Sequence, residues 1–224
     1  MQKFAAPTPV RTVLDIPAGR IQVIAADRDT ATVEVRPANA SKSRDVKAAA
    51  QVRVAHADGV LRIEAPQAKN RILGNTGSVE VTVQLPAGSR IEATSLAAEL
   101  RGVGRLGDVV FDGAHGPVKL DEAASVRLTG LDATVTIGRL NGPGEIGTLK
   151  GDLTVTEAAG DTLTLSTQQG DITVGAAYGI DATLNAGTVY GRIHNALTNT
   201  GSTAGTGLTI KATTAYGDIT VRSL

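Results

Sequence analysis

The chain has 224 residues, no formal net charge, no cysteine, 26 glycines and an aromatic content of only 2%. The lack of cysteine excludes disulfide scaffolds, thiolate metal sites, iron–sulfur clusters and cysteine nucleophiles. Because 42% of the residues are hydrophobic, the chain can bury a core of Val, Ile, Leu and Ala, which a disordered chain cannot do.

The charges are unevenly distributed along the chain. Residues 1–75 carry 12 basic and 7 acidic side chains, whereas residues 76–224 carry 10 basic and 15 acidic ones. This asymmetry is compatible with head-to-tail association, with a basic face for an anionic partner, or with two solvated surfaces. We expect no nucleic-acid partner, since a basic stripe with stacking aromatic residues is missing. We find no signal segment and no run of about 20 apolar residues, so we expect a cytoplasmic protein without a membrane span.

Residues 1–88 are predicted to form a β-rich N-terminal region that caps the rest of the chain. Candidate strands lie at 11–16, 20–25, 31–36, 51–56, 60–64 and 78–85. The Asp58-Gly59 pair between two of them is typical of a hairpin turn. The polar, alanine-rich stretch 41–50 predicts a helical turn or an exposed loop. Such a region would cover a sheet edge that could otherwise recruit foreign strands.

Residues 89–224 repeat a short pattern of Gly, usually Asp, and then apolar, polar and apolar residues. Clear copies begin at Gly107, Gly151, Gly170 and Gly217, and a weaker one begins at Gly191. The alternation within each copy has the period of two that marks a strand, and a second strand-like segment separates successive copies. From residue 132 onward the copies are about 19 to 26 residues apart.

This spacing predicts an all-β fold, a β-solenoid of roughly 19–21-residue coils, each with two short strands and glycine-containing corners. The solenoid would span residues 89–224, either as a separate domain or continuous with residues 1–88. An antiparallel meander is the alternative. It is less favoured, because Gly-Asp here opens each strand instead of joining two strands.

The serial Gly-Asp-Ile-Thr-Val segments at 170–174 and 217–221, preceded by the Leu-Pro-Ala-Gly turn at 85–88, resemble the DUF4097 family of adhesin-like β-strand-repeat proteins. The resemblance covers nearly the whole chain and is clearest over residues 79–224. It implies a solenoid-like β-repeat domain without an established enzymatic activity or catalytic residues. Some members of the family are secreted or tethered to membranes.

The residue pattern offers no catalytic, cofactor or metal constellation. The three histidines, His56, His115 and His194, lack the close spacing of metal ligands, and no Gly-x-Ser-x-Gly elbow is present. Residues 102–107 match Gly-x-Gly-x-x-Gly, but strand-like residues follow where a dinucleotide site needs a helix. We therefore expect no enzyme activity, no cofactor and no bound metal.

Two sets of residues are candidates for an interaction surface. If the coils stack in register, Asp152, Asp171 and Asp218 recur at one corner, together with Asp108. Stacked carboxylates could bind Ca²⁺, because successive turns would supply oxygen ligands. Alternatively, each aspartate accepts a nearby backbone N–H and shapes the corner, which is the interpretation we favour.

The second set consists of two tyrosines near the C-terminus. Tyr190 and Tyr216 stand at equivalent places directly before the repeat glycine. They could form a small aromatic contact surface or cover the open core of the last coil.

We therefore expect a non-enzymatic β-repeat scaffold or adhesin-like interaction protein with an unknown protein or polysaccharide partner. One alternative is a polysaccharide- or cell-surface-binding module, which would need the Asp and Tyr columns to line one groove. Another is a self-assembling structural protein. In solution we expect a monomer or weak self-association.

Overall fold

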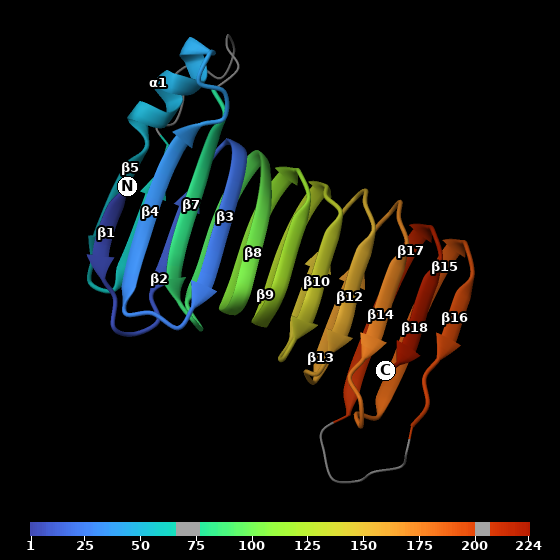
Figure 1. Cartoon of the computed structure of the whole chain (residues 1–224). Coiled ribbons are helices and arrows are strands. Elements are labelled where there is room, and N and C mark those ends of the chain that lie inside the picture. Colours follow the sequence, from blue (N-terminus) through green and yellow to red (C-terminus); the bar gives the residue numbers. More distant parts are fainter. Residues whose placement is uncertain (66–76, 200–206) are drawn as a thin grey trace.

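The computed structural model describes residues 1–65, 77–199 and 207–224 (Figure 1). Over these residues the chain forms one sheet of 18 strands and a single helix, which confirms the predicted all-β class. The elements are β1 (Gln2–Ala5), β2 (Arg11–Asp15), β3 (Ala18–Ala26), β4 (Thr30–Pro37), α1 (Ser43–Gln51), β5 (Arg53–Ala57), β6 (Val60–Glu64), β7 (Val79–Pro86), β8 (Arg90–His115), β9 (Val118–Asp132), β10 (Val135–Leu140), β11 (Gly144–Gly147), β12 (Leu153–Ala158), β13 (Thr162–Ser166), β14 (Ile172–Ala176), β15 (Ala182–Tyr190), β16 (Ile193–Ala196), β17 (Leu208–Tyr216) and β18 (Ile219–Ser223).

Most strands belong to one of two parallel ladders. The first ladder follows the order β6, β2, β8, β9, β11, β13, β17 and β15. The second follows β7, β3, β8, β9, β10, β12, β14, β18 and β16. The long strands β8 and β9 contribute to both ladders. We use the term repeat unit for a pair of consecutive strands and the corner between them. The first strand belongs to the first ladder and the second strand belongs to the second ladder.

The alternation seen in the sequence places the core between the two ladders. In β14, Ile172 and Val174 are fully buried, whereas Thr173 between them is half-exposed. Leu163 and Leu165 of β13 are buried in the same way. Side chains of both ladders join in a single hydrophobic cluster. Each such buried aliphatic side chain stabilises the fold by about 1.5–3 kcal/mol.

The order of the repeat units in space differs from their order in the sequence at both ends. Strand β17 lies between β13 and β15, and β18 lies between β14 and β16. The red strands of Figure 1, β17 and β18, therefore lie between the rest of the sheet and the orange strands β15 and β16, which form the outermost unit. At the other end, β2 lies between β6 and β8, and β3 lies between β7 and β8. The first and last repeat units of the sequence are thus both inserted between other units.

Antiparallel strands complete the N-terminal end. Strand β1 pairs with β4, β4 pairs with β7, and β5 forms a hairpin with β6. The hairpin turns at Asp58 and Gly59, whose φ angles of 51° and 72° confirm the turn predicted there. All six strands predicted before residue 88 are present, with ends shifted by at most two residues.

The polar, alanine-rich segment forms α1, which packs beside β4 and β7. The regions before and after residue 88 belong to the same sheet, since β2 and β3 pair with β8. In the described ranges, no helix has the length and apolar character needed to cross a bilayer.

Candidate interaction surface

The corner that precedes β12, β14, β18 and β16 brings the repeat glycines into contact. A Cβ on Gly170 would lie 2.2 Å from the carbonyl oxygen of Gly151, and one on Gly217 would lie 2.1 Å from that of Gly170. The φ angles of these glycines are also positive, at 122° for Gly151, 153° for Gly170 and 150° for Gly217. Glycine is therefore required at this corner, for its backbone angle and for the close approach of adjacent units.

The same corner holds Asp152, Asp171 and Asp218 in one column. The Asp152 carboxylate accepts the backbone N–H of Asp171 at 2.9 Å, and that of Asp171 accepts the N–H of Asp218 at 2.8 Å. Asp218 in turn accepts the N–H of Arg192 at 2.8 Å. Each carboxylate thus binds the backbone of the adjacent unit, which supports the corner-shaping interpretation. Among the residues that the structure describes, no group of three or more potential ligands is placed to hold a metal ion.

Asp108 does not belong to this column, so the expectation that it recurs at the same corner is wrong. It lies in the part of β8 that pairs with the first ladder, where it accepts the Ser125 hydroxyl at 2.6 Å and lies 3.6 Å from Arg90. The Gly-Asp motif therefore precedes strand segments of both ladders. At Asp108 it precedes the first-ladder part of β8, whereas the column aspartates precede strands of the second ladder.

Threonine hydroxyls form a further column that the sequence analysis missed. The hydroxyl of Thr167 donates to the Gly151 carbonyl at 3.2 Å, and that of Thr214 donates to the Gly170 carbonyl at 3.0 Å. Thr188 donates similarly to Gly217 at 3.0 Å. The available signal was a threonine three residues before the repeat glycines at 151, 170, 191 and 217, at positions 148, 167, 188 and 214.

Tyr190 and Tyr216 are brought together as a stacked pair. They are register partners in β15 and β17, and their ring centroids lie 5.0 Å apart at an interplanar angle of 8°. Their exposed fractions are 64% and 55%, so they project into solvent at the corner. Parallel backbone bridges extend this row of equivalent positions from Tyr216 to Gln169, and from Gln169 to Lys150. The tyrosine pair and the Asp column therefore lie at the same corner.

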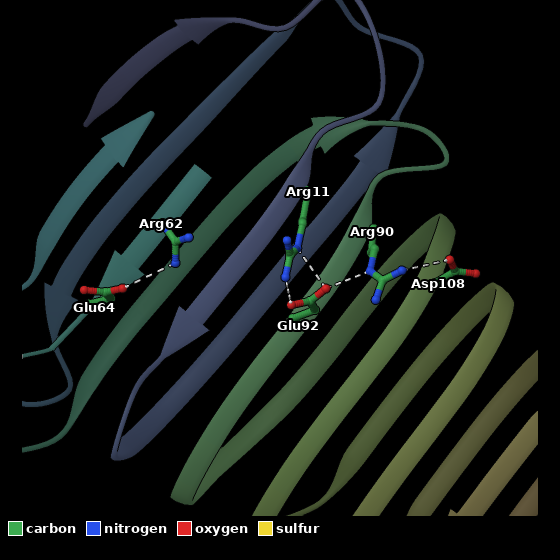
Figure 2. A network of polar contacts seen from close by, with 6 residues as sticks. All are labelled: Arg11, Arg62, Glu64, Arg90, Glu92 and Asp108. Carbon is green, nitrogen blue, oxygen red and sulfur yellow. Dashed lines mark hydrogen bonds and ion pairs between the residues drawn. The ribbon is translucent and has the colours of Figure 1, made fainter. Parts of the chain in front are cut away.

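The outer face of the first ladder carries a network of ion pairs (Figure 2). Arg11 donates to both carboxylate oxygens of Glu92, at 2.9 and 2.6 Å, and Arg90 donates to the same carboxylate at 2.8 Å. The hydrogen bond from Arg11 lowers the pKa of Glu92, and the same contact raises the pKa of Arg11. Arg90 extends the network to Asp108.

An open groove of about 400 Å³ adjoins this network and crosses β8, β9, β11 and β13. Its polar lining includes the Arg90–Asp108 pair, the Arg127–Glu145 pair with an N–O distance of 2.8 Å, and the hydroxyl of Thr164. The charged side chains in the groove are thus held in pairs and presented on rigid strands. Residues 102–107 lie within β8, so their glycines open no phosphate-binding helix.

No sequence profile of a known family matches this chain, and no curated protein matches it either. The fold is similar to the crystal structure of a putative adhesin from Bacteroides fragilis NCTC 9343, which is 14% identical with a TM-score of 0.56 over 100% of this chain and 95% of that one. A putative adhesin from Parabacteroides distasonis ATCC 8503 is 17% identical with a TM-score of 0.43, over 100% of this chain and 95% of the other. The comparison with the Bacteroides protein establishes a shared fold.

Proposed function

We propose that this protein is a non-enzymatic interaction scaffold of the adhesin type, built as a β-solenoid and related to the DUF4097 family. The in-register parallel ladders around a single core support the solenoid description. The shared fold with the putative adhesin from Bacteroides fragilis supports the adhesin-like assignment. The Gly-Asp corner motifs support the family relationship.

The groove over β8, β9, β11 and β13 carries this proposal. Polar side chains of its lining stand on successive strands at the strand spacing of about 4.8 Å, which suits an extended polar partner that binds along several repeat units. Here Arg127 and Glu145 neutralise each other, as do Arg90 and Asp108.

A groove-filling substitution tests this function. Labelled protein would be applied to arrays of proteins and of polysaccharides, and Thr164→Arg is expected to lower the signal of any genuine partner at least tenfold. Thr173→Arg is the matched control, because Thr173 has the same chemistry on the outer face of the second ladder, away from the groove. Binding that survives Thr164→Arg would place the contact elsewhere. Substrate turnover abolished by a single substitution would overturn the non-enzymatic assignment.

A second candidate function is recognition of a polysaccharide at the tyrosine pair. One face of the Tyr190 ring packs on Tyr216, and both residues are largely exposed, so a sugar ring could stack on the pair. The chain has no tryptophan and three tyrosines, so tyrosine fluorescence reports directly on binding. Tyr190→Ala is expected to abolish the response to a binding oligosaccharide. Tyr178→Ala is the control, because Tyr178 is 90% exposed and lies outside the pair.

A further inference from the structure

The outermost repeat unit at the C-terminal end presents two strand edges. Within the described ranges, β15 pairs only with β17, and β16 pairs only with β18. All four residues of β16 are exposed. On β15, the side chain of Asn199 bonds to the backbone N–H and carbonyl of Ala182 and so covers the first position of the strand. Beyond that position, the backbone N–H and C=O groups on the outer side of the edge can pair with another strand.

The residues on this edge lack the usual protection against pairing. Soluble proteins commonly protect edge strands with charged side chains, but β15 and β16 contain none. Val189 is 71% exposed and Ile193 is 46% exposed. Leu184 and Ala186 pack against the core but are only partly buried. The hydrophobic core therefore reaches the surface at this end.

At the N-terminal end, β1 and β5 are likewise paired on one side only within the described residues, with β4 and β6, but this end differs in its side chains. Its outermost strands, β1 and β5, carry the charged residues Lys3 and Arg53. A ring contact between Phe4 and His56, with centroids 5.4 Å apart, joins these two strands across the end of the core. These charges disfavour head-to-tail pairing of β1 and β5 with the uncharged C-terminal edge.

We infer that the β15–β16 edge binds the same edge of a second copy of this chain, in a two-fold symmetric dimer. A two-fold axis perpendicular to the stack would pair the edges antiparallel and join the two cores into one. Residues 180–199 of the end unit number 20. The unit can therefore contribute at most 20 residues, which is the lower limit of the roughly 20–30 that each partner contributes to a stable interface. Because the contact is made by one end only, assembly stops at the dimer.

This inference is independent of the groove, and light scattering coupled to gel filtration tests it. The full chain is expected to show twice its mass of 22.8 kDa. Ile193→Lys is expected to raise the dimer dissociation constant at least tenfold, and Val189→Lys is expected to act in the same direction.

The matched control is Leu149→Lys, because Leu149 is exposed to 47% but lies away from this end. This variant is expected to remain dimeric. A wild-type monomer at every concentration, larger polymers, or a dimer that Ile193→Lys leaves unchanged would each overturn the inference. Circular dichroism would show that the lysine variants keep their β structure.

Discussion

Replacing Gly170 by alanine tests the close stacking of the repeat units directly. The new Cβ would lie 2.2 Å from the Gly151 carbonyl oxygen, whereas Cβ atoms essentially never approach another heavy atom within 3.0 Å. The backbone φ of 153° is also unfavourable for any residue with a side chain. The two units must therefore separate locally, or Gly170 must change its conformation.

Both responses cost free energy. A residue held at a sparsely populated backbone angle costs about 1–3 kcal/mol. Separation of the units would lengthen the backbone bonds from Gly151 N–H to Gln169 at 2.8 Å and from Leu153 N–H to Asp171 at 2.9 Å. Each such bond contributes about 1 kcal/mol. We therefore expect the free energy of unfolding to fall by roughly 3–5 kcal/mol, which corresponds to a Tm lower by about 6–20 °C for a chain of this size.

Gly179→Ala separates the backbone cost from the steric overlap. Gly179 has a positive φ of 77°, but nothing lies within 4 Å of a Cβ built there. We expect this control to lose only about 1 kcal/mol. Urea unfolding followed by circular dichroism would compare both variants with the wild type. Equal losses for Gly170→Ala and Gly179→Ala would show that the units are not stacked as closely as described.

Two further predictions concern side chains that link repeat units. Asp171→Ala removes the acceptor for the Asp218 N–H and is expected to cost about 1 kcal/mol, whereas Asp171→Asn keeps an acceptor oxygen and should cost less in the same urea titration. The pKa of Glu92 is lowered in the folded state by Arg11, so its contribution to stability is present above the unfolded value of about 4.3 and is lost as the pH falls through the lower folded value. Glu92→Gln should therefore flatten the dependence of Tm on pH in the acid range, and an unchanged profile would contradict this linkage.

The strands and the corners could be predicted from the sequence because both depend on local chemistry. A period of two in apolar residues identified β14 and β18, and Gly-Asp identified the corners. The in-register Asp column followed from the same spacing, because equivalent positions in stacked units must lie above one another. The pairing of Tyr190 with Tyr216 likewise agrees with their equivalent places before the repeat glycine.

The order of the units could not be predicted in this way. Ile210 of β17 is paired with Leu163 of β13 on one side and with Leu184 of β15 on the other. Either neighbour offers the same apolar and polar alternation, so docking of β15 on β13 would satisfy the pattern equally well. The choice depends on packing along the whole unit, which no local motif encodes. The same limit explains Asp108, whose motif does not reveal which ladder the next strand joins.

The inserted positions of the first and last repeat units have a consequence for biosynthesis. A ribosome releases β15 and β16 before β17 and β18, although the later pair separates the earlier one from the rest of the stack. The β15–β18 region therefore cannot reach its final arrangement until residues 208–224 have emerged. A nascent or truncated chain that lacks residues 208–224 would present the edges of β13 and β14 to other strands, with the aggregation hazard that such edges bring. Synthesis of residues 208–224 is thus the step that closes this fold.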